Sequence, residues 1–156
     1  MRKALLAAVW MAVASVSPGV AQSGARESAR DKLIGSWRLA WVEEQQPDGT
    51  MKRYTDRLGT IVYTRDGHMS VQIMLPEGRS VPENNPVKYD RGGYEAYYGP
   101  YEVDEAVHTV THHVEGALVR SLIGKDLTRV YRFEGKQLIL TSSRPDERWT
   151  IAWEHN

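Results

Sequence analysis

Apolar and polar side chains alternate with a period of two over most of this chain. In the clearest case, His68–Leu75, the apolar residues Met69, Val71, Ile73 and Leu75 fall on one side. Successive side chains of a β-strand point to opposite faces of its sheet, so this alternation indicates a strand with one buried face. Similar patterns predict further strands at residues 37–42, 59–64, 101–103, 107–115, 127–134, 137–142 and 149–154.

Short turn sequences separate most of these segments. Asp66-Gly67 and Gly135-Lys136 each join two of them and are typical of tight β-hairpins. Strands joined by such short links pair antiparallel, and eight strands with one apolar face each can close into a barrel that leaves no exposed edge. We therefore expect an all-β fold, an eight-stranded antiparallel up-and-down barrel, with a two-sheet sandwich as the alternative.

One connection is longer than the others. Residues 76–93 are polar and contain Pro76, Pro82 and Pro86, so this segment cannot lie inside a sheet. We expect a long loop here, with a short helical turn at residues 94–98. A loop of this length either carries binding groups or is simply a solvated connection.

The N-terminal segment has the features of a secretory signal. Arg2 and Lys3 precede an apolar stretch that ends in small residues at Ala21. A membrane anchor is the alternative, but the apolar stretch is shorter than the roughly 20 residues that a spanning helix needs. We expect cleavage of residues 1–21, a flexible segment at 22–32, and a barrel domain at 33–156 that is periplasmic or secreted, with no membrane span.

Composition excludes several classes of protein. The chain has 156 residues and no cysteine, which rules out disulfide scaffolds, cysteine-ligated metals and thiol nucleophiles. Its 20 basic residues balance 20 acidic ones, whereas nucleic-acid-binding domains carry a basic excess. Dinucleotide, phosphate-loop and haem-attachment motifs are also missing from the sequence, so no cofactor and no nucleic-acid partner are expected.

Three histidines lie close together in one predicted strand. His112 and His113 are neighbours and must point to opposite faces, while His108 and His112 share a face but stand about 13 Å apart at about 3.3 Å per residue. That spacing is too long for one metal ion, so no metal site is expected. His112 shares the face of Val110 and Val114, and we expect it to point inward as a ligand contact or as a satisfied core histidine. The opposite register, with His113 inward, stays open.

Arg129 is out of place on an interior face. It alternates in phase with Leu127, Tyr131 and Phe133, and a buried charge is costly unless it is paired. Three roles are possible: an ion pair with an inward carboxylate, stacking on a tryptophan, or binding of an anionic ligand head group.

Aromatic side chains gather on the faces expected to point inward, at Trp37, Trp41, Tyr63, Tyr131, Trp149 and Trp153. Such rings provide apolar contact, and their N–H and O–H groups can orient a ligand. The same rings can also fill a core, and filled and open barrels share one sequence pattern. The candidate ligand contacts are Trp37, Tyr63, Met69, Tyr98, Tyr101, His112, Arg129, Tyr131 and Trp149.

Several segments together resemble a known family. Gly35-Ser36-Trp37 looks like the Gly-x-Trp signature of lipocalins, and residues 33–41, 59–72, 97–103 and 110–116 resemble the lipocalin-like domain family of bacteria and fungi. Residues 124–134 and Trp153-Glu154 match more loosely. Arg91-Gly92-Gly93 departs from that family, which usually has an acidic, helix-forming stretch here. The resemblance implies a barrel that takes up a small apolar molecule, and some fungal members imply that enzymes occur in the family.

Three functions are consistent with these features. The first is an exported binding protein that holds a small hydrophobic or amphipathic molecule inside its barrel. The second is an isomerase or cyclase that uses the same cavity, in which His112 moves a proton and Arg129 stabilises a developing oxyanion. The third is a filled barrel that presents its surface to a protein partner.

Overall fold

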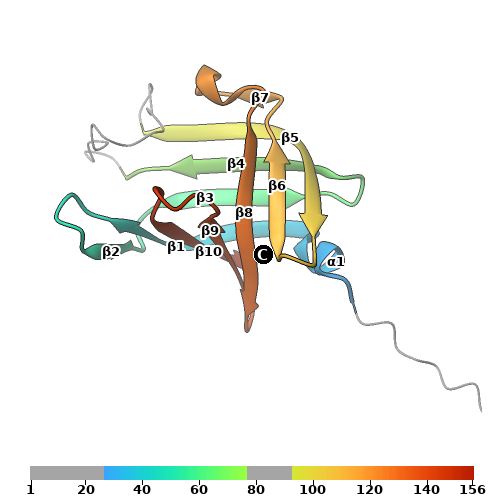
Figure 1. Cartoon of the computed structure of the whole chain (residues 1–156), viewed down its shortest axis with the longest axis horizontal. Coiled ribbons are helices and arrows are strands. Elements are labelled where there is room, and N and C mark those ends of the chain that lie inside the picture. Colours follow the sequence, from blue (N-terminus) through green and yellow to red (C-terminus); the bar gives the residue numbers. More distant parts are fainter. Residues whose placement is uncertain (1–26, 77–92) are drawn as a thin grey trace, which may run out of the picture.

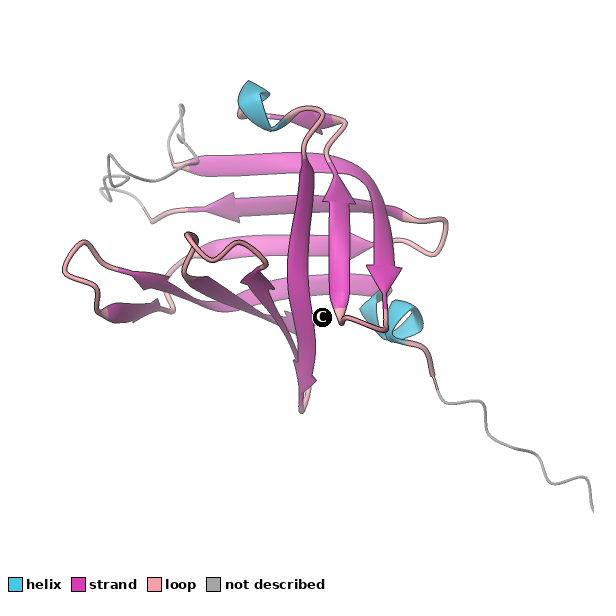
Figure 2. Cartoon of the chain, viewed as in Figure 1, coloured by secondary structure: helices cyan, strands magenta, loops and turns pink. Residues whose placement is uncertain are grey.

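The computed structural model describes residues 27–76 and 93–156, and most of the regular structure in this part is β-strand (Figure 2). The two helical segments are α1 (Ala29–Leu33) and the 3-10 helix η1 (Arg120–Leu122). The strands are β1 (Gly35–Gln45), β2 (Met51–Tyr54), β3 (Leu58–Tyr63), β4 (His68–Met74), β5 (Tyr94–Asp104), β6 (Thr109–His113), β7 (Gly116–Ala117), β8 (Asp126–Glu134), β9 (Gln137–Ser142) and β10 (Trp149–His155).

Antiparallel pairing closes these strands into a barrel (Figure 1). The order in the sheet is β10-β9-β8-β6-β5-β4-β3-β1-β2, and β10 also pairs with β1. β2 and β3 pair with successive parts of β1, and β6 and β7 pair with successive parts of β5. The ten segments therefore fill eight positions around the barrel. The predicted eight-stranded antiparallel barrel is confirmed.

Helix α1 covers one end of the barrel. The side chain of Leu33 is fully buried, and Trp37 Nε1 donates a hydrogen bond to the Leu33 carbonyl oxygen at 2.8 Å. Ser28 caps the helix by accepting from the backbone N–H of Asp31. Helix α1 thus occupies part of the segment, residues 22–32, that was expected to be flexible. We call this end, which α1 covers, the closed end.

Aromatic rings fill the half of the barrel next to the closed end. Tyr63 and Tyr101 pack edge to face with ring centroids 4.9 Å apart. Phe133 contacts both Trp37 and Tyr131, at centroid distances of 6.5 and 5.9 Å. Such pairs stabilise the core beyond the area that they bury.

Two sequence predictions in the middle of the chain are wrong. Residues 94–98 form the start of β5 rather than a helical turn, because they pair in register with residues 70–74 of β4. The strand expected at residues 107–115 is shorter, because β6 begins at Thr109. His108 lies in the preceding turn with a φ of 55°, so it does not share a strand face with His112.

Trp41 points outward, against the sequence prediction. The pairing of β1 with β10 shifts register between Leu39 and Trp41, and a bulge of this kind moves the following side chains to the opposite face. Val42 is therefore buried in the core, and the Arg53 guanidinium lies 3.8 Å from the Trp41 ring centroid on the outside.

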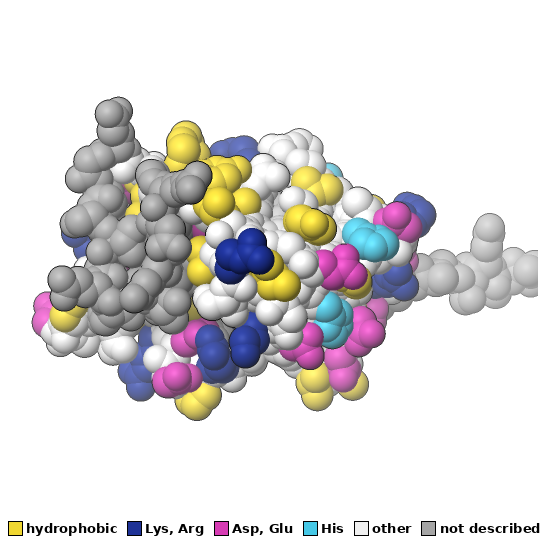
Figure 3. All heavy atoms as spheres, turned by 90° about the horizontal axis from the view of Figure 1, so that it is seen from above, with side chains coloured by type: hydrophobic (Ala, Val, Ile, Leu, Met, Phe, Trp, Pro, Cys, Tyr) yellow, Lys and Arg dark blue, Asp and Glu magenta, His cyan; other side chains and the backbone are white. Residues whose placement is uncertain are grey.

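The expected signal segment at residues 1–21 and most of the long loop, residues 77–92, lie outside the described residues. No helix in the described ranges is long and apolar enough to cross a membrane. The face drawn in Figure 3 mixes acidic and basic side chains, with hydrophobic ones between them.

Candidate functional site

The described residues surround a cavity of about 1180 Å³ inside the barrel. It lies toward the end opposite α1, where the loops between β1 and β2, before β8, and between β9 and β10 form its mouth. Its wall includes the aliphatic side chains of Ile61, Val71, Ile73, Leu140 and Ile151. The barrel therefore combines a filled half at the closed end with an open half at the mouth.

Three side chains from β3, β5 and β6 form a hydrogen-bonded row beside this cavity. His112 on β6 bonds through Nε2 to the Tyr63 hydroxyl on β3 at 2.8 Å, and through Nδ1 to the Tyr97 hydroxyl on β5 at 3.2 Å. Tyr97 and His112 line the cavity, whereas Tyr63 lies behind them in the core. Both ring nitrogens of His112 therefore have a hydroxyl partner.

Burial keeps all three groups neutral. It lowers the pKa of His112 to about 3, and the positive charges of Arg129 and His113 act in the same direction. Burial likewise raises the pKa of Tyr97 to about 12 and the pKa of Tyr63 well above its usual value. A neutral imidazole donates one hydrogen bond and accepts another, so it can join one hydroxyl to the next.

Arg129 on β8 is a second polar feature of the cavity wall. Its guanidinium lies 4.8 Å from the ring centroid of Trp149, and Nη1 donates to the Thr128 carbonyl oxygen at 3.2 Å. Within the described residues, Arg129 forms no ion pair with a carboxylate. Stacking on a tryptophan is therefore present, and an ion pair with an inward carboxylate is not seen in this part of the chain.

A different arginine near the mouth is paired. Arg57 is 9% exposed, and its Nη1 and Nη2 donate to the two carboxylate oxygens of Glu44 at 2.7 and 2.6 Å. Both residues line the cavity, and Glu95 is a further buried acidic residue of its wall. Of the four arginines that line the cavity, Arg57 is bound bidentately by Glu44 and Arg144 pairs with Glu147, whereas Arg129 and Arg148 have no carboxylate partner among the described residues.

The structure brings together three of the predicted site residues, since His112, Arg129 and Trp149 all line the cavity. Tyr63 supports His112 from behind. Trp37, Met69 and Tyr131 are buried in the core and do not line the cavity.

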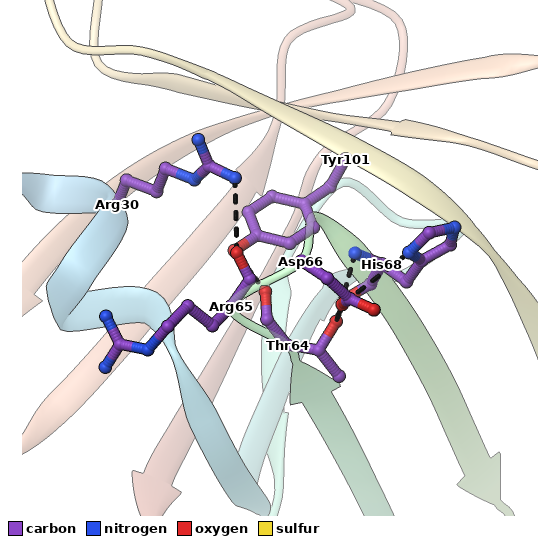
Figure 4. A network of polar contacts seen from close by, with 6 residues as sticks. All are labelled: Arg30, Thr64, Arg65, Asp66, His68 and Tyr101. Carbon is purple, nitrogen blue, oxygen red and sulfur yellow. Dashed lines mark hydrogen bonds and ion pairs between the residues drawn. The ribbon is translucent and has the colours of Figure 1, made fainter.

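Tyr101 is held at the closed end rather than at the cavity. Its hydroxyl donates to the Thr64 carbonyl oxygen at 3.0 Å, within the polar network of the β3–β4 turn (Figure 4). In that network Thr64 also bonds to Asp66, and Arg30 of α1 donates to the Arg65 carbonyl oxygen. This network fixes α1 to the turn.

Tyr98 lies on the outer surface. It is 57% exposed, because Tyr97 occupies the inward position beside it. Tyr97 was missed as a site residue, since the prediction of a helical turn at residues 94–98 concealed the strand alternation. Applied to this segment, the alternation places Glu95, Tyr97 and Gly99 on one face.

The register of β6 agrees with the expected orientation of its histidines. His112 is 1% exposed inside the barrel. His113 points outward, with Nδ1 2.7 Å from Asp126 Oδ1 and Nε2 3.8 Å from Glu102 Oε2. Over the described ranges, no three His, Asp or Glu side chains converge as they would around a metal ion.

Comparisons with known proteins find a matching family model and several similar solved structures. A family model described as a lipocalin-like domain matches residues 34–154. A solved lipocalin-like protein from Bacteroides uniformis is 15% identical, with a TM-score of 0.47 and coverage of 80% of this chain and 99% of that one. A protein from Bacteroides eggerthii is 12% identical, with a TM-score of 0.46 and coverage of 80% of this chain and 99% of that one. A mutant of the fluorescent protein UnaG is 13% identical, with a TM-score of 0.40 and coverage of 80% of this chain and 96% of that one. No curated protein matches the chain.

Proposed function

Because the chain belongs to the lipocalin-like domain family, we propose that its barrel binds one small hydrophobic or amphipathic molecule. The observation that carries this proposal is the cavity of about 1180 Å³, whose lining combines aliphatic and aromatic side chains with many polar and charged ones. In small-molecule sites apolar contact provides affinity and polar groups fix the orientation, so this lining suits an amphipathic molecule.

The ligand contacts in this proposal are the residues that line the cavity. Trp149 and the aliphatic wall contact the apolar body of the ligand, and His112, Tyr97 and Arg129 face its polar end. The buried aromatic residues at the closed end support the shape of the cavity without touching the ligand.

Binding is favoured over catalysis by the state of His112. An isomerase or cyclase would use His112 to move a proton, but burial lowers its pKa to about 3. At neutral pH the imidazolium is therefore scarce, and a general acid works best with a pKa near the working pH. The same neutral ring is well suited to hold a fixed hydrogen bond.

Export is part of the same proposal. The basic start and the apolar stretch of residues 1–21 support a cleaved signal that delivers the barrel to the periplasm or the medium. Fractionation of cells that express the full chain, followed by N-terminal sequencing of the product, tests this step. A protein retained in the cytoplasm with Met1 intact would contradict it.

The test of binding is native mass spectrometry on the protein purified from its own host. We expect extra mass that disappears on denaturation and that belongs to a molecule smaller than the cavity. A complementary titration uses N-phenylnaphthylamine, a neutral dye whose fluorescence rises in apolar surroundings. A bare mass together with no dye binding would refute the proposal and favour a surface that contacts another protein.

A further inference from the structure

We propose that the ligand carries an oxyanion, such as a carboxylate or sulfonate, which accepts hydrogen bonds from Arg129 and from the Tyr97 hydroxyl. This inference rests on the proposed binding function, and it specifies which class of molecule the cavity selects. The supporting observation is a cationic side chain on the cavity wall without an ion-pair partner among the described residues.

Arg129 is half-buried on the cavity wall. The desolvation of a cation is costly, and proteins usually offset it with a carboxylate at hydrogen-bond distance. Arg57 in the same cavity follows that rule, because Glu44 binds it with both oxygens. Arg129 has instead a neutral carbonyl, that of Thr128, and the face of the Trp149 ring. Its charge is left for a group that enters the cavity.

The geometry of Arg129 suits a planar anion. A guanidinium is a flat fork of five N–H donors, and it binds carboxylates with two parallel hydrogen bonds. Stacking on Trp149 occupies a face of the fork, and Thr128 takes a hydrogen bond from Nη1. The other N–H groups lie in the plane of the fork, which is where an oxyanion binds.

The hydrogen-bonded row supplies a second donor. Tyr63 is enclosed in the core, and within the described residues His112 Nε2 is its hydroxyl's hydrogen-bond partner. The Tyr63 hydroxyl is satisfied if it donates to Nε2, which places the single imidazole proton on Nδ1. Nδ1–H then donates to Tyr97 Oη, and the Tyr97 proton is free to point into the cavity. His112 therefore acts as a positioning residue for the Tyr97 hydroxyl.

Arg129 and Tyr97 lie close enough to act on one anion. Tyr97 and Arg129 both line the cavity. Burial and the charge of Glu95 raise the pKa of the Tyr97 hydroxyl, and the charge of Arg129 opposes them by lowering it. An anion between them would serve as the counter-ion of Arg129 and accept a hydrogen bond from the Tyr97 hydroxyl.

The test compares two dyes that share one ring system. Anilinonaphthalene sulfonate carries an anionic group, and N-phenylnaphthylamine lacks it. We expect the protein to bind the sulfonate more tightly than the neutral dye. Arg129→Gln should weaken sulfonate binding roughly ten- to hundredfold, as expected for loss of a charged hydrogen bond, while neutral-dye binding changes little.

Arg132 offers a matched control on the same strand. Its side chain is about half exposed on the outer face of β8, where it pairs with Glu134. Arg132→Gln removes the same charge from the protein and should leave both dye affinities unchanged. Equal losses in Arg129→Gln and Arg132→Gln would indicate a general effect of net charge and overturn the inference.

The outcomes separate this inference from the proposed function. Failure of both dyes to bind, together with a bare mass in native mass spectrometry, refutes the binding proposal itself. If both dyes bind equally well and Arg129→Gln changes neither affinity, the proposal that the barrel binds small molecules stands, but the inference of an oxyanion is overturned.

A measurement on the unaltered protein covers the case of a variant that does not fold. Dodecanoate should displace the neutral dye at a concentration at least roughly tenfold lower than methyl dodecanoate does. Displacement by the ester at the same concentration or a lower one would overturn the inference.

The position of the single imidazole proton of His112 is tested separately. Nitrogen chemical shifts of the His112 ring should show a neutral imidazole with the proton on Nδ1. Tyr97→Phe should lower the affinity for the sulfonate more than the affinity for the neutral dye. A proton on Nε2, with no effect of Tyr97→Phe on sulfonate binding, would remove Tyr97 from the site.

Discussion

Acidification should destabilise this protein through His112. The ring is 1% exposed and lies between the hydroxyls of Tyr63 and Tyr97, with the charge of Arg129 nearby and His113 next to it on β6. Burial, aided by these positive charges, lowers the pKa of His112 to about 3. The folded protein therefore keeps this ring neutral at a pH where the unfolded chain, with a histidine pKa of about 6.5, has already bound a proton.

The sign and the size of the effect follow from proton linkage. Between about pH 6.5 and pH 3 the unfolded state binds one more proton at this position, so the free energy of unfolding falls as the pH falls. The limiting slope is about 1.4 kcal/mol per pH unit. Between about pH 7 and pH 5 the loss of unfolding free energy is about 2 kcal/mol, once the gradual titration of the unfolded chain is included.

Chemical denaturation followed by tryptophan fluorescence measures this loss. The unaltered protein should lose about 2 kcal/mol between about pH 7 and pH 5, and His112→Gln should show a much flatter dependence, whatever its absolute stability. His113→Gln is the matched control, because it removes the neighbouring, outward-pointing histidine, and it should keep the slope of the unaltered protein. An undiminished slope in His112→Gln would refute the reasoning.

Direct titration of the ring provides a check that does not depend on a variant. Proton NMR of the folded protein should show the His112 ring signals unchanged down to about pH 4, because a group with a pKa near 3 is still mostly neutral there. A midpoint near pH 6.5 would show that burial does not keep the ring neutral.

Three further predictions concern the cavity wall and the core. Trp149→Leu removes the ring that stacks on Arg129 and should weaken anilinonaphthalene sulfonate binding about fivefold more than binding of the neutral dye, measured by fluorescence titration. Gly99→Ala should lower the free energy of unfolding by at least about 2 kcal/mol, because a Cβ there would lie 1.9 Å from the His113 carbonyl oxygen. Chemical denaturation measures this loss, and a loss under about 0.5 kcal/mol would contradict the prediction. Leu33→Ala, at the closed end, should lower the free energy of unfolding by about 2–5 kcal/mol. It should leave both dye affinities unchanged at temperatures where the variant is folded.

The barrel could be predicted because its strands repeat one simple rule. Along β4, Met69, Val71 and Ile73 are buried as the alternation indicates, since one face of each strand must turn inward. Asp66-Gly67 and Gly135-Lys136 both connect antiparallel neighbours. These local signals agree with the global pairing, so the order of strands follows from the order of the sequence.

Local irregularities set the limit of that rule. The register shift between Leu39 and Trp41 inverts the inward phase of β1 and sends Trp41 outward, and no residue type in the segment marks this bulge. Likewise, Tyr94–Tyr98 contains residues that also suit a turn, and it becomes a strand because β4 offers a partner along its whole length. Pairing between strands overrides local preference in both cases.

Whether the barrel is open depends on where large and small inward side chains lie along the strands. Trp37, Tyr63 and Tyr101 lie at the ends of β1, β3 and β5 that meet α1, and their rings fill that half. Val71 and Ile73 lie farther along β4 toward the mouth, where smaller side chains leave the cavity. Neither composition nor period contains this information, because both treat an inward ring and an inward valine alike. The gradient of side-chain size toward the mouth explains why Tyr97 and Arg129 line the open half of the barrel instead of a packed core, with His112 holding the Tyr97 hydroxyl in place.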